Sequence, residues 1–249
     1  DDLNFMIGRK ELNYGDQLLV GPLNWNSVGR SFDLALVNYQ FSFGNIDLFS
    51  AKVRDLNSTA AGAGDKDFSG LYSANNLGEY FQNVDGYVFL SEDATGASKL
   101  STTAYGTRLK SPVGSVDYRA EVTLENVKGA AKTSDENQMD LEVGYMAWPE
   151  HKLRVAAEYF QATENFDQLY PTGHKWLGYA DLLSRRNVQG FRGGVSSQIT
   201  DQLNLSLDYH NFSRISTSAP AYKLSGAAYG GAGTDAEIGD EWDLVAGYK

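Results

Sequence analysis

Apolar and polar residues alternate along most of the chain, and this alternation predicts β-strands. In the stretch 115–127 every second residue from Val116 to Leu124 is apolar, and most of the residues between them are charged. Successive side chains of a strand point to opposite faces, so such a segment has one apolar and one polar face. The pattern is strict in some segments, such as 137–148 and 202–213, and blurred in others.

We expect twelve strands, at about 3–12, 31–43, 45–55, 66–75, 83–92, 100–110, 115–126, 137–148, 151–162, 187–199, 202–213 and 240–249. Short connections at 43–45, 111–114, 149–150 and 200–201 alternate with long ones, of which 13–30, 163–186 and 214–239 are the longest. An up-and-down meander with one compact end and one elaborated end has this order of loops. A Greek-key sandwich would place long connections at both ends.

Strand length and aromatic placement favour a membrane barrel. About ten residues at roughly 3.3 Å, tilted near 40°, rise about 25 Å, which matches the apolar band of an outer-membrane barrel. Aromatic residues lie near strand ends, as interfacial girdles do, at Phe41, Phe43, Tyr145, Trp148, Trp242 and Tyr248. We therefore predict an all-β fold, a transmembrane up-and-down antiparallel β-barrel forming one domain over 1–249. A soluble β-sandwich is the alternative, and extraction without detergent would support it.

Composition agrees with this fold and excludes several functions. The chain has 15 Tyr, 12 Phe and 26 Gly but only 5 Pro, and no apolar run long enough for a membrane-spanning helix. A net charge of −11 argues against nucleic-acid binding, and the absence of cysteine excludes thiolate metal sites. The three histidines lack metal-ligand spacing and no nucleophile motif is present, so we expect no metal, no cofactor and no enzymatic activity.

Two stretches carry a resemblance to a known family. They are GRKELNYGDQLLVGPLNWNSVGRSFD at 8–33 and DQLYPTGHKWLGYADLLSRRNVQGFRGG at 167–194. Both resemble the alginate-export and related porin family of Gram-negative outer membranes. The resemblance implies a single closed barrel of about eighteen strands, which passively conducts solutes, in the best-known case a polyuronate. Twelve strands are fewer, and Lys249 is not the usual terminal aromatic residue, so we expect a larger barrel truncated here at one or both ends.

The polar strand faces would then line a water-filled lumen. The acidic residues predicted to point inward are Asp117, Glu121, Glu125, Asp140, Glu142, Glu158, Asp208, Glu241 and Asp243, and the basic ones are Arg119, Arg154 and Arg192. This wall is predominantly acidic. Cross-strand pairs such as Arg119 with Asp140, or Arg154 with Glu142, would neutralise part of it.

The resemblance places Arg9 and Arg30 on matching motif positions, where they would face a constriction and hold a carboxylate. A second interpretation is a salt-bridge network that pins a loop inside the barrel, formed by Arg9, Glu11, Asp16, Arg30 and Asp33. The two interpretations are compatible, because a pinned loop narrows a wide barrel. In the late loop we expect a short helical turn within 179–187 and solute contacts from Trp176, Tyr179, Arg185 and Arg186.

These observations predict an integral protein of the bacterial outer membrane that passes small hydrophilic solutes or an exported polysaccharide through a charged lumen. Its expected partners are outer-membrane lipid, lipopolysaccharide and the solute, with no nucleic acid. The sequence predicts no particular protein partner. The alternative is a non-conducting structural or adhesive barrel within a membrane assembly, and planar-bilayer conductance separates the two.

Overall fold

The computed structural model describes residues 2–54, 64–96, 98–129 and 133–249. Most of the long connection expected at 56–65 lies outside the described residues. One antiparallel sheet holds twelve strands in chain order, and two further short strands form a separate hairpin outside it. They are β1 (Asp2–Lys10), β2 (Phe32–Phe41), β3 (Gly44–Arg54), β4 (Lys66–Asn75), β5 (Asn83–Asp93), β6 (Leu100–Val113), β7 (Val116–Lys128), β8 (Thr133–Trp148), β9 (Leu153–Ala162), β10 (Val188–Gln198), β11 (Leu203–Ser213) and β14 (Glu237–Tyr248).

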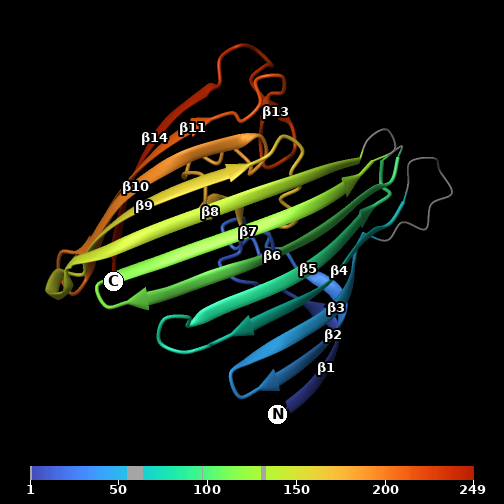
Figure 1. Ribbon diagram of the computed structural model, residues 1–249, viewed down its shortest axis with the longest axis horizontal. Coiled ribbons are helices and arrows are strands. Elements are labelled where there is room, and N and C mark those ends of the chain that lie inside the picture. The colour runs from blue at the N-terminus through green and yellow to red at the C-terminus, as the bar shows by residue number, and fades with distance from the viewer. Residues whose placement is uncertain (1, 55–63, 97, 130–132) are drawn as a thin grey trace.

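The predicted meander is confirmed, but the alternation of its connections holds only in part, because β7 ends at Lys128 and β8 begins at Thr133, where a long connection is predicted. The sheet is strongly curved, and in the part of the chain that is described β1 pairs only with β2 and β14 only with β11, so the sheet is not closed (Figure 1). One end carries tight turns. Between β6 and β7 the turn contains Gly114 at φ 63°, a left-handed conformation that glycine adopts without strain. Between β8 and β9 lies the 3-10 turn η1 (Pro149–His151).

The convex face of the sheet is apolar and exposed. The alternating strand positions Leu3, Phe5 and Ile7 are all more than half exposed. Large aromatic residues stand exposed toward the tight-turn end, among them Phe43, Tyr145, Trp148 and Tyr248, as the sequence predicts for one girdle. Among the described residues, no helix is long and apolar enough to cross a membrane.

The concave face divides into two regions of different chemistry. From β2 to β6 it is mainly apolar and aromatic, with buried Phe32, Leu34, Phe49, Phe68 and Phe89. From β7 to β11 it is mainly charged, with buried Arg119, Glu121, Asp140 and Glu158. In the early strands apolar residues lie on both faces of the sheet, and for this reason the alternation of apolar and polar residues is blurred there. We call these regions the apolar half and the charged half of the inner wall.

Two long connections fold into the concavity of the sheet (Figure 1). The first inward loop, residues 11–31, follows β1, and the second inward loop, residues 163–187, follows β9. They meet in a short parallel bridge between Val20 and Tyr170, where the Tyr170 amide donates to the Leu19 carbonyl at 2.8 Å. The Thr172 amide donates to the Gln17 carbonyl at 3.0 Å. The two loops are therefore joined to each other by main-chain hydrogen bonds.

The expected helical turn within 179–187 is not present. The only helical turn of the second inward loop is the 3-10 turn η2 (Gly173–Lys175), and residues 181–184 have no regular structure. The backbone of this stretch instead bonds to a distant segment of the chain, because the Ser184 amide donates to the Tyr222 carbonyl at 2.7 Å. Tyr222 belongs to the small hairpin β12 (Ala221–Tyr222) and β13 (Ala228–Tyr229).

Candidate channel interior

The first inward loop is held against the apolar half by packing. Leu12, Leu18 and Val20 are almost completely buried. Tyr14 stacks on Tyr72 of β4 with ring centroids 4.3 Å apart, and its hydroxyl donates to Asp47 of β3 at 3.0 Å. Burial raises the pKa of Tyr14, and the Asp47 charge adds to this, so the phenol stays protonated and remains a donor. The loop thus extends the apolar core of the wall.

The second inward loop is held by wall carboxylates that accept its main-chain amides. Glu125 accepts from the Asp167 amide at 2.8 Å, and Glu136 accepts from the Asn165 amide at 3.1 Å. On β14, Glu241 accepts from the Ala180 amide at 2.7 Å. A carboxylate is a strong acceptor for an otherwise unpaired backbone N–H inside a fold. Glu125 and Glu241 of the predicted acidic wall therefore anchor this loop, together with Glu136, which was not predicted.

A buried ionic cluster joins the second inward loop to the centre of the charged half. Arg185 and Asp140 both have side chains that are 0% exposed, and they form an ion pair. Arg119 of β7 pairs with the same carboxylate, as the sequence predicts. Both guanidiniums lie over the Trp176 ring, that of Arg119 at 4.5 Å and that of Arg185 at 5.5 Å from its centroid. Glu158 adds negative charge beside the cluster, at 3.5 Å from Arg119.

Further toward the tight turns, ion pairs run across β7 to β11. Arg154 donates to Asp117 at 2.8 and 2.5 Å and to Glu142 at 2.5 Å, which includes the second predicted pair. Arg192 joins the remaining carboxylates of the row, bonding Glu142 at 2.6 Å, Glu158 at 2.7 Å and Asp208 at 3.2 Å. Most of these inward carboxylates are paired with a guanidinium.

Asp16 joins three elements at the tip of the first inward loop. Its carboxylate accepts from Arg108 at 2.9 Å and from Lys110 at 2.8 Å, both on β6. Its carbonyl accepts from Lys175 of the second inward loop at 3.1 Å. Burial raises the pKa of Asp16, but the Lys110 hydrogen bond and the Arg108 charge outweigh it and lower the pKa to about 2. Burial lowers the pKa of Lys175, and the negative charge of Asp16 partly offsets this lowering.

A cavity of about 500 Å³ lies between the inward loops and the tight-turn end of the wall, and we call it the inner chamber. Its most exposed charges are the amines of Lys110 and Lys175, at 45% and 46%. The carboxylates of Glu142 and Glu158 are only 13% and 2% exposed. Asp117 is the most open carboxylate and is bound by Arg154. Cations therefore face the water of this chamber more than carboxylates do, contrary to the acidic wall that the sequence predicts.

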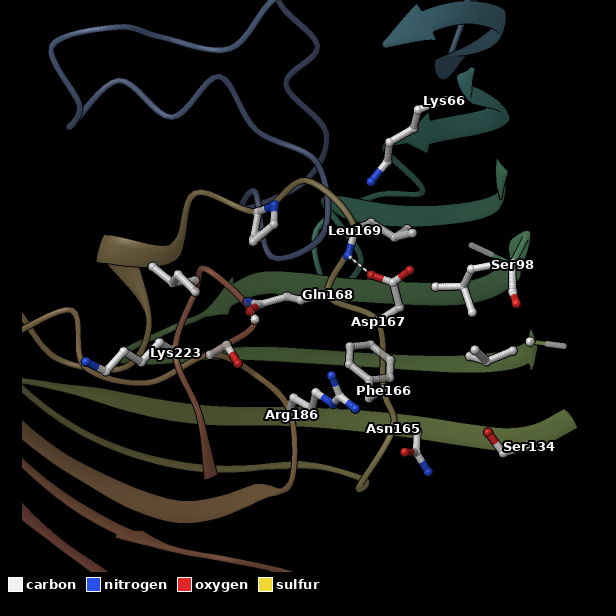
Figure 2. Close-up of a pocket in the computed structure, with 17 residues that line it drawn as sticks. Lys66, Ser98, Ser134, Asn165, Phe166, Asp167, Gln168, Leu169, Arg186 and Lys223 are labelled. Atoms are coloured by element: carbon white, nitrogen blue, oxygen red, sulfur yellow. Dashed lines mark hydrogen bonds between the residues drawn. The ribbon is translucent and has the colours of Figure 1, made fainter. Parts of the chain in front are cut away.

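A second cavity, of about 610 Å³, lies toward the long-loop end and is the outer chamber. Figure 2 shows Phe166, Asp167 and Gln168 of the second inward loop crossing it, with Lys66, Arg186 and Lys223 around them. Each of these three cations lies over a tyrosine ring, Arg186 at 3.9 Å from that of Tyr222. The second inward loop lines both cavities.

The structure contradicts the inward placement of Arg9 and Asp33. They pair across β1 and β2 at 2.7 Å, with side chains 70% and 55% exposed. Arg9 shares its strand face with Ile7, which is 89% exposed, whereas Leu34, next to Asp33, is buried on the opposite face. Strand alternation therefore puts this pair on the convex face, outside the lumen. It forms no network with the first inward loop.

Arg30 does pin the loops, although through carbonyl groups. Its guanidinium donates to the Pro171 carbonyl at 3.0 Å and to the Gly21 carbonyl at 3.3 Å, and it lies over the Tyr170 ring. The predicted salt-bridge network is therefore wrong in its partners. Among the five residues proposed for it, Arg9 and Asp33 bond each other, while Asp16 bonds β6.

Of the four predicted loop contacts, Arg185 is inaccessible to a solute and Trp176 is almost completely buried at the edge of the inner chamber. Trp176 is 5% exposed and Arg185 is completely buried, so both have a structural role in the ionic cluster. Tyr179 is 49% exposed and Arg186 lines the outer chamber, so these two stay candidates for solute contact. No group of three or more histidine, aspartate or glutamate residues in the described part of the chain is arranged to hold a metal ion.

Sequence reasoning missed Lys110, Lys175 and the partners of Asp16. The apolar run Leu18-Leu19-Val20 inside a long connection was a usable signal, because such a run is buried only if the loop folds inward. No local sequence pattern predicts which cations of the wall bond Asp16. That contact joins residues 92 positions apart and depends on the curvature of the sheet.

Comparison with known proteins agrees with this architecture. The OccK11 (OpdR) crystal structure from Pseudomonas aeruginosa superimposes with a TM-score of 0.60 at 12% sequence identity, covering 98% of this chain and 65% of that one. The outer-membrane expressed OmpT of Vibrio cholerae gives a TM-score of 0.57 at 11% identity, covering 99% of this chain and 76% of that one. This chain thus spans less than two thirds of the length of OccK11. A search of curated protein sequences found no match.

The twelve-stranded antiparallel meander, with its exposed apolar convex face and its charged interior, has the fold of an outer-membrane β-barrel, of which it forms an unclosed part. The alginate export family model matches residues 2–249, and the chain belongs to that family. It is an integral protein of the bacterial outer membrane. The resemblance found in the two sequence motifs is thereby confirmed.

Proposed function

We propose that this chain forms the wall and the constriction of a passive outer-membrane channel for small hydrophilic solutes or an exported polysaccharide. The observation that carries the proposal is the pair of inward loops, which lie in the concavity of the sheet and leave two cavities with charged residues on their walls. Such a constriction selects solutes by size and charge without a chemical step. The tight-turn end, where the inner chamber lies, corresponds to the periplasmic side of outer-membrane barrels.

The charge facing the inner chamber favours anionic solutes. Lys110 and Lys175 present ammonium groups to the cavity, and Arg154 and Arg192 lie beside them at 25% and 23% exposure. The carboxylates behind them are occupied by ion pairs and loop amides. A solute carboxylate entering the chamber therefore meets donors with little competing negative charge.

The reversal potential in a salt gradient tests this preference. We expect the full-length protein to prefer anions, and the double substitution Lys110→Gln and Lys175→Gln to reduce the anion-to-cation permeability ratio several-fold. Arg9→Gln is the matched control, because it removes a cation from the convex face only. Cation preference in the unmodified protein would refute the proposed selectivity.

A non-conducting barrel is the second candidate, and one observation favours it. The first inward loop fills the apolar half with fully buried side chains such as Leu12, Leu18 and Val20, as a plug does. In that case the two chambers would be closed recesses and the protein would serve as a structural or adhesive component of a membrane assembly. A steady absence of current in planar bilayers would support this alternative.

A further inference from the structure

The tip of the first inward loop is pressed tightly against the wall. A turn closes where the Gln17 amide donates to the Tyr14 carbonyl at 2.9 Å, and Gly15 within it has φ +55°. A Cβ atom at Gly15 would lie 3.1 Å from both Arg108 Cδ and the Tyr72 hydroxyl, so only glycine allows this approach without displacement. The turn brings the next residue, Asp16, directly onto the cations of β6.

Three cations converge on Asp16, and two of them have no other carboxylate. Arg108 also pairs with Asp85 at 2.5 Å. For Lys110 and Lys175, Asp16 is the only ion-pair partner in the described part of the chain. Without this carboxylate, three positive groups would share a site in which Arg108 is only 7% exposed. Arg108 would keep Asp85 but lose one partner of a buried ion pair, which is destabilising, and the two half-exposed lysines would lose their carboxylate, so the arrangement depends on Asp16.

We propose that Asp16 is a positioning residue of the lumen, a tethered carboxylate that fills a three-cation site and holds both inward loops against β6. Its side chain fixes the first loop to Arg108 and Lys110, and its carbonyl fixes Lys175 of the second loop. The consequence for conduction rests on the proposed channel function. The site itself does not, because it is a property of the folded protein.

A site occupied by a tethered carboxylate accepts a free one when the tether is removed. Asp16→Ala leaves the guanidinium and the two ammonium groups facing the space that the carboxylate filled. A small carboxylate such as acetate can then make the same charge-assisted hydrogen bonds. Binding to the folded state alone raises stability with ligand concentration.

Thermal unfolding in detergent micelles, with acetate exchanged for chloride at constant ionic strength, tests the site. We expect Asp16→Ala to lower Tm by roughly 5 °C or more, and acetate to restore at least half of the loss. Asp117→Ala is the matched control, because Asp117 pairs with Arg154 and bonds neither inward loop. An equal effect of acetate on the wild type and both variants would overturn the proposal, as would an unchanged Tm for Asp16→Ala. Should Asp16→Ala not fold, Asp16→Asn gives the same test, with acetate raising its Tm and not that of the wild type.

Single-channel recording tests the consequence for conduction. We expect Asp16→Ala to give a noisier open current with additional conductance levels, acetate to quieten it, and Asp16→Glu, which keeps a carboxylate, to stay closer to the wild type. A current from Asp16→Ala as steady as that of the wild type would contradict the positioning role. If no variant conducts at all, the proposed function fails, while the acetate-dependent Tm still decides the role of Asp16.

Discussion

The two halves of the inner wall hold their loops by different physical means. In the apolar half, Phe32, Phe49, Phe68 and Phe89 form a ring cluster on which the first inward loop packs, with ring centroids 5.1 to 6.3 Å apart where they contact. In the charged half, carboxylates and guanidiniums bind the second inward loop through ion pairs and main-chain amides. The comparison shows that burying a loop in a barrel needs either apolar side chains on both partners or a matched set of polar groups.

The two solutions leave different chemistry facing the lumen. Packed aromatic residues exclude water and present no charge, so most of the apolar half contributes shape alone, and its inward cations Arg108 and Lys110 lie on β6, at its border with the charged half. Ion pairs in the charged half cost desolvation, which Asp140 and Glu142 offset by each bonding more than one guanidinium group, while other carboxylates of the wall accept loop amides. Where this network thins toward the tight turns, Lys110 and Lys175 remain half-exposed and give the inner chamber its charge. The proposed selectivity is therefore placed where the two halves meet.

The largest effect is expected from breaking the buried pair of the charged half. Arg185→Met leaves the carboxylate of Asp140 without its partner from the second inward loop and weakens the packing around Trp176. Removing one partner of a buried ion pair costs about 3–5 kcal/mol. Chemical denaturation in detergent, followed by tryptophan fluorescence, measures this loss. Arg186→Met is the neighbouring control and should cost about 1 kcal/mol or less, because its guanidinium is only partly buried.

The double substitution Arg185→Met with Asp140→Leu sharpens the test. If unpaired charge causes the loss, the double variant should recover much of the stability that Arg185→Met removes, since replacing both partners by apolar groups is often neutral. A double variant that is less stable than Arg185→Met would show that packing, and not charge, holds the second inward loop.

A somewhat smaller effect is expected in the apolar half. Phe68 is fully buried and contacts Phe32, Phe49, Phe89 and Tyr170. Phe68→Ala should cost about 3 kcal/mol through lost contacts and a cavity. The same denaturation assay should give this loss at low and at high salt alike. A loss that changed markedly with ionic strength would contradict the division into two halves.

The smallest effect is a pH dependence at the junction between the halves. The pKa of Asp16 falls from its ordinary value of 3.8 to about 2 in the folded protein, so its contribution is complete above pH 4 and is lost as the pH falls toward 2. The shift corresponds to about 2 kcal/mol. Unfolding measured between pH 5 and 2 should show this loss in the wild type and a smaller one in Asp16→Asn. Identical pH profiles for the two proteins would refute the assignment.

Much of the fold follows from the sequence because a strand wall repeats one local rule. Alternation located all twelve strands of the main sheet to within a few residues, and it correctly assigned Asp117, Arg119 and Glu121 to the concave face. It also gave the pairs of Arg119 with Asp140 and Arg154 with Glu142. These pairs join neighbouring strands, whose register follows from short turns.

The interior was harder to predict because it depends on contacts between distant segments. Arg9 and Asp33 lie in a stretch that resembles the family, but such a resemblance does not reveal which strand face they occupy. Trp176 and Arg185 looked like solute contacts in a polar loop, yet the loop folds inward and buries both. Nothing local to residues 11–31 indicates that the loop tip reaches β6.

Planar-bilayer recording of the full-length protein tests the central claim most directly. A passive channel divided by fixed inward loops should give steady, voltage-independent steps of current whose size grows with salt concentration, with a reversal potential on the anion side in a salt gradient. No current under conditions in which the protein is folded and inserted would contradict the account and leave a plugged, non-conducting barrel.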